Sequence, residues 1–159
     1  MKISVLGAGG WGTTLGILLH YNGHQVTLWE YKKNYVKELI KKRVNSIYLP
    51  GIKIPEEIEI THDLKESVHQ KNLIILSVPS QFLRSVIQDV SYFDIKNSIL
   101  VSVAKGIENK HLMTMSQMLK DVHPNLSEEQ IGVLSGPSHA EEVSKRIPTA
   151  VVAASTEIE

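Results

Sequence analysis

The stretch Ile3-Ser4-Val5-Leu6-Gly7-Ala8-Gly9-Gly10-Trp11-Gly12 places a short apolar run directly before a G-x-G-x-x-G pattern. This order predicts a strand, a tight turn and a helix, the context in which the pattern is typical of a dinucleotide site. Gly7 allows the tight turn, Gly9 leaves room for a pyrophosphate, and Gly12 lets the helix pack closely on the strand. The free N–H groups at the helix start then face the phosphates. The alternative is an ordinary glycine-rich turn.

The composition is that of an ordinary globular protein, because 42% of the 159 residues are hydrophobic and 21% are charged. Seventeen basic and seventeen acidic side chains cancel, so no charge excess points to nucleic acid or an anionic membrane. The chain has no cysteine, which excludes disulfides, a thiolate nucleophile and a cysteine-based metal site. Its apolar runs are too short to span a bilayer, and only Met1-Lys2 precedes the first expected strand. We therefore expect a single-domain cytoplasmic protein.

Short apolar runs typical of strands alternate along the chain with segments whose apolar residues have helical spacing. This alternation predicts a doubly wound, mostly parallel α/β sheet of the Rossmann-like type. Runs rich in Val, Ile and Leu predict strands at 3–6, 26–29, 73–78, 99–103, 131–134 and 150–153, with a weaker one at 58–61. Helices are predicted at 13–22, 34–44 and 80–90, with a capping box at 63–66 and a short helix after Ser127. We expect an irregular loop at 45–55 and a buried final strand at 149–154.

The candidate functional segments all follow expected strands, at 7–12, 30–33, 77–81, 105–106 and 136–140. Because the carboxyl ends of parallel strands meet at one edge, we expect these segments to share one ligand crevice.

Glu30 follows Gly12 by 18 residues, close to the spacing of about 20 at which an acidic residue bonds the adenosine ribose and favours NAD. Lys32 and Lys33 could instead hold the 2′-phosphate of NADP, and all three could be solvated loop charges. The backbone of Ser77-Val78-Pro79-Ser80 is expected to line the nicotinamide-side ribose. The alternative there is a plain strand-to-helix turn with Pro79 at the first helical position.

Lys105 ends an apolar run and precedes Gly106, so its amine is expected to project into the crevice toward an anionic or carbonyl-bearing ligand. The alternative is a lysine that reaches water from the strand end. In the following Ser135-Gly136-Pro137-Ser138-His139-Ala140, Gly136 permits a close backbone approach and Ser138 is a candidate N-cap of a second anion-binding helix. The alternative is a capped helix without a ligand, and His139 is a candidate proton carrier.

The seven histidines lack metal-ligand spacing, so we expect no metal site. A G-x-S-x-G nucleophile elbow is missing from the sequence as well, which argues against a hydrolytic triad.

Seven segments, in order and over essentially the whole chain, resemble the N-terminal domain of the bacterial NAD(P)-dependent sn-glycerol-3-phosphate dehydrogenase family. They are Gly7–Gly12, Asn22–His24, Leu28-Trp29, Asn45–Pro50, Val78–Ser80, Ala104–Glu108 and Ser135–Ser138. The K-G-[IL]-E and S-G-P-[ST] motifs are much more specific than the glycine pattern. One departure is Glu30, where many relatives carry a small residue, which leaves the choice between NAD and NADP open.

The resemblance implies reversible hydride transfer between sn-glycerol 3-phosphate and dihydroxyacetone phosphate, as in glycerophospholipid precursor synthesis. It implies that Lys105 is the catalytic lysine that polarises the substrate oxygen. Cofactor contacts are implied or expected for Gly7, Gly9, Gly10, Trp11, Gly12, Glu30, Tyr31, Lys32, Tyr48, Pro79, Lys105 and Ala140, and substrate contacts for Lys105, Gly136 and Ser138.

The family's proton-transferring lysine lies in an all-helical C-terminal domain. We therefore expect residues 1–159 to be a dinucleotide-binding domain, a fragment without that domain and inactive alone; the resemblance also allows a homodimer of the full-length protein. Two alternatives remain open: a non-catalytic NAD(H)-sensing module, and the N-terminal domain of another two-domain dehydrogenase of the 6-phosphogluconate or hydroxyacyl-CoA type.

Overall fold

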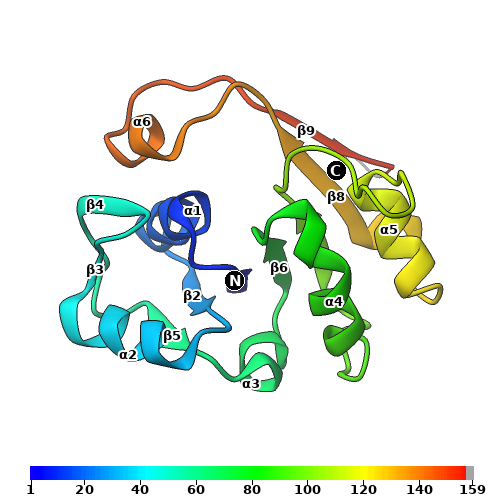
Figure 1. Ribbon diagram of the computed structural model, residues 1–159, viewed down its shortest axis with the longest axis horizontal. Coiled ribbons are helices and arrows are strands. Elements are labelled where there is room, and N and C mark those ends of the chain that lie inside the picture. The colour runs from blue at the N-terminus through cyan, green and yellow to red at the C-terminus, as the bar shows by residue number, and fades with distance from the viewer. Residues whose placement is uncertain (157–159) are drawn as a thin grey trace.

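A seven-stranded sheet forms the centre of the computed structural model, which describes residues 1–156 (Figure 1). The strand order is β5-β2-β1-β6-β7-β8-β9, and every neighbouring pair is parallel except β8 and β9. The predicted doubly wound, mostly parallel Rossmann-like sheet is thus confirmed. The strands are β1 (Lys2–Leu6), β2 (Gln25–Trp29), β5 (Glu59–Thr61), β6 (Leu73–Leu76), β7 (Ile99–Ser102), β8 (Ile131–Ser135) and β9 (Val152–Ser155).

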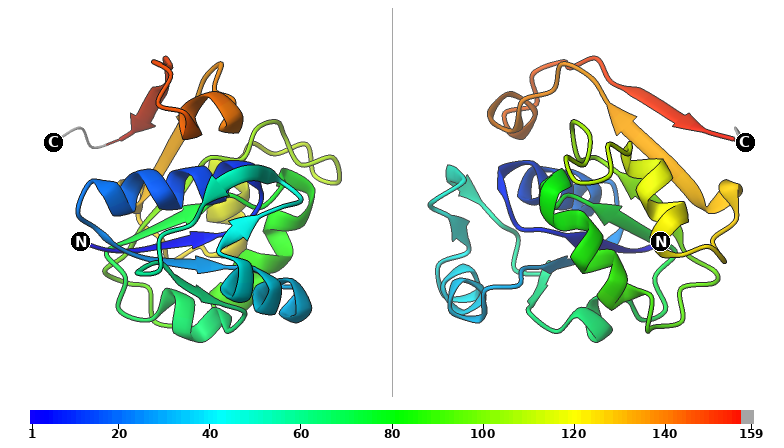
Figure 2. Two further views of the ribbon diagram at one scale, coloured as in Figure 1. Left: turned by 90° about the vertical axis from the view of Figure 1, so that its left-hand side faces the viewer. Right: turned by 45° about the vertical axis from the view of Figure 1, so that its right-hand side comes forward.

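Helices cover both faces of the sheet, as the two turned views in Figure 2 show. One core cluster contains buried residues of α1 (Gly10–Tyr21) and α2 (Lys33–Lys42), and the other contains those of α3 (Leu64–Val68), α4 (Ser80–Val90) and α5 (Met115–Val122). A single 3₁₀ turn at Glu128–Gln130 confirms the short helix expected after Ser127. A further helix, α6 (Ala140–Ser144), lies on the segment that joins β8 to β9. None of the helices within residues 1–156 is long and apolar enough to cross a membrane.

Three local expectations need correction. The expected loop at 45–55 contains an antiparallel hairpin of β3 (Val44–Asn45) and β4 (Leu49–Lys53). The final strand forms but its four residues are all exposed, because β9 is the outermost strand and pairs only with β8. At α3, Asp63 accepts from the Glu66 N–H, but the Glu66 carboxylate accepts from the Thr61 hydroxyl, so the capping box is only half formed.

The hairpin is held by the fully buried side chain of Asn45. Its Oδ1 accepts from the Tyr35 hydroxyl and from the Tyr48 N–H, the latter at 2.9 Å. Its Nδ2 donates to the Ala8 carbonyl at 2.8 Å and to the Thr13 hydroxyl at 2.7 Å. Burial raises the pKa of the Tyr35 hydroxyl to about 12, so this group remains a hydrogen-bond donor. Asn45 therefore joins the hairpin to the glycine-rich turn after β1.

We expect Asn45→Asp to lower the free energy of unfolding by about 2–4 kcal/mol, because a buried carboxylate cannot donate to the Ala8 carbonyl. Urea denaturation would measure the difference. Asn97 is exposed, so the control Asn97→Asp should change stability by less than about 0.5 kcal/mol. Equal effects of the two substitutions would contradict the role of Asn45.

Candidate functional site

The five candidate segments follow the carboxyl ends of β1, β2, β6, β7 and β8, as the sequence predicts. Contacts join several of them. The Lys105 amine reaches the Ser138 carbonyl, and the backbone of Gly7 lies against that of Ser77. The site is therefore assembled at one edge of the sheet from segments that lie far apart in the chain.

The turn between β1 and α1 needs glycine for two different reasons. Gly7 has a φ of +110°, and a Cβ there would lie 2.9 Å from the Ser77 backbone. A Cβ on Gly12 would lie 1.9 Å from the Gly7 carbonyl oxygen, so α1 can start on the strand end only without a side chain. These contacts agree with the tight turn and close packing that the sequence predicts.

Gly9 differs from its neighbours, because a Cβ on it would meet no atom within 4 Å. Its φ of −69° and ψ of −178° are open to any residue, so neither packing nor backbone strain requires glycine here. Gly9 is also the N-cap of α1, and no side chain caps the helix. Free space and uncapped N–H groups at a helix start fit a pyrophosphate.

The start of α1 is enclosed by two distant segments. A Cβ on Gly10 would lie 2.6 Å from the Tyr48 carbonyl oxygen and 3.5 Å from the Ala140 Cβ. The Thr14 hydroxyl donates to the Ala140 carbonyl at 3.2 Å. Trp11 is half-buried and packs against the core. The residues expected at the cofactor thus surround one helix end.

Glu30 is 7% exposed and accepts a hydrogen bond from the Lys32 N–H at 3.1 Å, so it is not a solvated loop charge. Tyr31 and Lys32 are exposed, and the Lys32 amine lies 5.3 Å from the centre of the Tyr31 ring. Hydrogen bonding to Tyr31 raises the pKa of Lys32. A shallow cavity of about 530 Å³ adjoins these residues and is lined by Lys32, Lys33, Asn34, Tyr35, Glu38, Ile47 and Tyr48. Both the acidic and the basic side chains therefore remain candidates for contact with the adenosine ribose.

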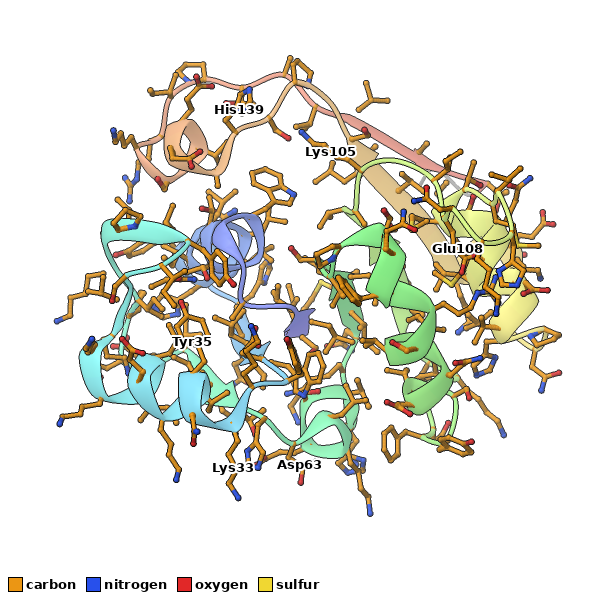
Figure 3. All side chains as sticks on the ribbon, viewed as in Figure 1. Lys33, Tyr35, Asp63, Lys105, Glu108 and His139 are labelled. Carbon is orange, nitrogen blue, oxygen red and sulfur yellow. The ribbon has the colours of Figure 1, made fainter. Side chains whose placement is uncertain are left out.

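Lys105 lies three residues after the end of β7 and just before Gly106, whose φ of +94° turns the chain sharply. The lysine is exposed, and its Nζ donates to the Ser138 carbonyl oxygen at 3.0 Å. Figure 3 shows Lys105 beneath the segment that carries His139.

Pro79 is the N-cap of α4 and not its first residue. The hydroxyl of the next residue, Ser80, lies 3.8 Å from where a Gly106 Cβ would be.

The S-G-P-S segment differs from expectation in two ways. The N-cap of α6 is His139, not Ser138, and its side chain makes no capping bond. The helix has only five residues, so its dipole is small. Gly136 has a φ of +145°, and a Cβ there would lie 2.8 Å from the Ala150 carbonyl oxygen. The close approach at Gly136 is thus to the chain itself, and its contact with substrate stays a prediction.

Sequence reasoning assigned no role to three side chains that fix this site: Asn45, Gln81 and Arg84. Asn45 holds the hairpin, while Gln81 and Arg84 bind the loop after Lys105. Glu108, the acidic residue of the K-G-I-E motif, was the sequence signal that could have indicated Arg84, because a carboxylate near a buried strand needs an ionic or hydrogen-bonding partner. Within residues 1–156, no group of three or more His, Asp or Glu side chains could hold a metal ion.

Comparisons with known proteins identify the family and the fold of this chain. Residues 2–159 match the family model described as NAD-dependent glycerol-3-phosphate dehydrogenase N-terminus. A glycerol-3-phosphate dehydrogenase [NAD(P)+] of Fusobacterium nucleatum is 47% identical over 154 residues, which are 96% of this chain and 45% of that protein. One from a Thermoanaerobacter species is 47% identical over 99% of this chain and 46% of its own length. The chain thus spans about half the length of the curated relatives that it matches.

A crystal structure of glycerol-3-phosphate dehydrogenase from Coxiella burnetii is also similar, with a TM-score of 0.90 and 33% identity. The match covers 98% of this chain and 47% of that one. A Plasmodium falciparum glycerol-3-phosphate dehydrogenase has a TM-score of 0.87 at 24% identity, over 99% of this chain and 46% of its own, and supports the fold alone.

We expect Gly9→Val to weaken binding of NAD(H) or NADP(H) by at least about tenfold, which is ~1.4 kcal/mol, because the side chain would fill the space left for the pyrophosphate. Titration calorimetry measures the affinity. The melting temperature should change little, since a Cβ at this position would meet no protein atom within 4 Å. The control Gly16→Ala, further along α1 beside Val26, should keep wild-type affinity. Unchanged binding by the Gly9 variant would place the pyrophosphate elsewhere.

Glu30→Gly should improve binding of NADP(H) relative to NAD(H), because it removes a carboxylate that would repel a 2′-phosphate and bond a ribose hydroxyl. The ratio of the two dissociation constants is the measurement. Glu57→Gly, at an exposed loop position, serves as the control and should leave the ratio as it is. If Glu30→Gly also leaves it unchanged, Glu30 does not face the cofactor.

Proposed function

The chain belongs to the family of the NAD-dependent glycerol-3-phosphate dehydrogenase N-terminus, and on that premise we propose that it binds NAD(H) or NADP(H) for an oxidoreductase. The reaction is reversible hydride transfer between sn-glycerol 3-phosphate and dihydroxyacetone phosphate. The observation that carries this proposal is the 3.0 Å hydrogen bond from the Lys105 amine to the Ser138 carbonyl. It joins the K-G-I-E and S-G-P-S motifs at the edge of the sheet where α1 also begins.

The glycine-rich turn binds and orients the cofactor. The uncapped N–H groups of α1 donate to the pyrophosphate, and Gly9 leaves the space for it. Tyr48 and Ala140 enclose the helix start. In this proposal Glu30, Tyr31 and Lys32 contact the adenosine ribose. The bound nicotinamide supplies the hydride chemistry, and this part of the chain supplies position and electrostatics.

Lys105 supplies a positive charge to the substrate oxygen. Its Nζ has three N–H groups, and the Ser138 carbonyl accepts from one of them. The other two can donate to an oxygen on which negative charge develops during hydride transfer. In this proposal Gly136 and Ser138 contact the glycerol phosphate, and a lysine outside these 159 residues moves the proton, as the family resemblance implies.

We also propose that the full-length protein is a cytoplasmic enzyme of glycerophospholipid precursor synthesis. In this protein, residues 1–159 form the dinucleotide-binding domain beside a helical substrate domain. A homodimer of the full-length protein is part of the same proposal. Size-exclusion chromatography with light scattering on the complete gene product tests the dimer.

We expect a polypeptide of residues 1–159 to bind NAD(P)H without oxidising it in the presence of dihydroxyacetone phosphate, because the proton-transferring group is elsewhere. In the complete gene product, Lys105→Ala should lower kcat/KM on the order of a hundredfold, since it removes one stabilising charge at the reacting oxygen. Nicotinamide absorbance follows both reactions.

The control is Lys110→Ala, an exposed lysine of the same loop, which should keep kcat/KM. Both lysines are exposed, so neither substitution should shift the melting temperature. Turnover by residues 1–159 alone would overturn the assignment of the proton-transferring group. A complete gene product without activity on either substrate would overturn the proposed reaction.

A further inference from the structure

The loop that follows Lys105 is fastened to α4 by a buried ion pair. The Glu108 side chain is 6% exposed, and both of its oxygens accept from the Arg84 guanidinium, with Nη2 to Oε2 at 2.9 Å. His111 Nδ1 lies 2.8 Å from the same Oε2. Arg84 Nη1 also donates to Asp121 of α5 at 2.6 Å. Hydrogen bonding to Arg84 lowers the pKa of the Glu108 carboxyl to about 2, so the pair is charged at neutral pH.

A second side chain of α4 fixes the backbone of the same loop. Gln81 Nε2 donates to the Ile107 carbonyl at 2.8 Å, and its Oε1 accepts from the Asn109 N–H at 3.0 Å. The loop closes on itself where Glu108 N donates to the Met113 carbonyl at 2.8 Å. The residues on both sides of Glu108 are therefore held to the first turn of α4.

These contacts begin two residues after Lys105. Only Gly106 lies between Lys105 and Ile107, the first residue of the loop that is bound to α4. Gly106 has a positive φ, and because glycine has a wide range of allowed φ and ψ angles, it restricts the path of the chain very little. Lys105 lies three residues after the end of β7, so the position of its amine at the Ser138 carbonyl depends on where the following loop is held.

We propose that Gln81 and Arg84 are positioning residues for Lys105, acting through Ile107, Glu108 and Asn109 of the loop. The proposal rests on the proposed role of Lys105 in the reaction. Within the part of the chain that the structure describes, neither Arg84 nor Glu108 makes a hydrogen bond to the glycine-rich turn or to the S-G-P-S segment. Their influence on the site therefore passes through the loop backbone.

The test compares two arginines whose side chains are buried to a similar extent. The Arg84 side chain is 17% exposed and that of Arg43 is 15% exposed, and Arg43 holds a different loop by donating to the Ile58 carbonyl. In the complete gene product, Arg84→Gln and Gln81→Ala should lower kcat by about tenfold or more, because small misplacements of a reacting group cost large factors in rate. The KM for NAD(P)H should stay within about twofold, because Gln81 and Arg84 make no hydrogen bond to the glycine-rich turn or to residues 30–32, where most of the expected cofactor contacts lie.

The second readout does not depend on turnover. Competitive trace acetylation followed by mass spectrometry gives the reactivity of the Lys105 amine relative to the exposed Lys37. This ratio should rise at least about threefold in Gln81→Ala and Arg84→Gln, because an amine that no longer donates to the Ser138 carbonyl is more accessible to the reagent. It should stay at the wild-type value in Arg43→Gln. Gln81 is exposed, so Gln81→Ala provides the test even where loss of Arg84 prevents folding.

A wild-type Lys105 ratio in the Gln81 and Arg84 variants would overturn the proposal, and so would an equal rise in Arg43→Gln. A fall in kcat together with an equal rise in the KM for NAD(P)H would do the same, because it would indicate general damage to the site. If the wild-type gene product turns over neither substrate, the proposed reaction fails, and the acetylation ratios still decide whether α4 positions Lys105.

Discussion

The architecture of this site depends on how closely the backbone of α1 approaches the Gly7 carbonyl. A side chain on Gly12 would lie 1.9 Å from that oxygen, so the helix can begin directly on the end of β1 only because the residue is glycine. The first-turn N–H groups then face the edge where β6, β7 and β8 also end. Tyr48 and Ala140 both lie against a helix start fixed in this way.

Several residues in the sequence motifs bind one part of the protein to another. Asn45 joins the hairpin to the glycine-rich turn, Gly136 allows a close pass of Ala150, and Glu108 is paired with Arg84. Gly9 is the opposite case, since open space surrounds it. A motif at such a site therefore combines residues that shape the crevice with residues that face a ligand, and only the contacts tell them apart.

The sheet and most helices could be predicted because their apolar periods are strong and local. The helix α5 was missed, although Thr114 and Gln117 form a capping box that its sequence displays. The hairpin at 44–53 has no two-residue period and is held by Asn45, a contact between distant segments that no local pattern contains. The exposure of β9 depends on its place at the sheet edge, since its apolar composition reads as a buried strand. Among the site residues, strand ends were predictable, but partners such as Arg84 were not.

The enclosure of Gly10 has a consequence for the order of folding during synthesis. The residues that surround it, Tyr48 and Ala140, follow it in the chain by 38 and 130 residues. Contacts between distant residues form slowly, and those to Ala140 cannot form until nearly the whole sheet has left the ribosome. The nascent chain thus completes the enclosure of the α1 start late. A dinucleotide bound there, as proposed, would stabilise all these segments at once, so its cellular concentration would contribute to the stability of the entire sheet.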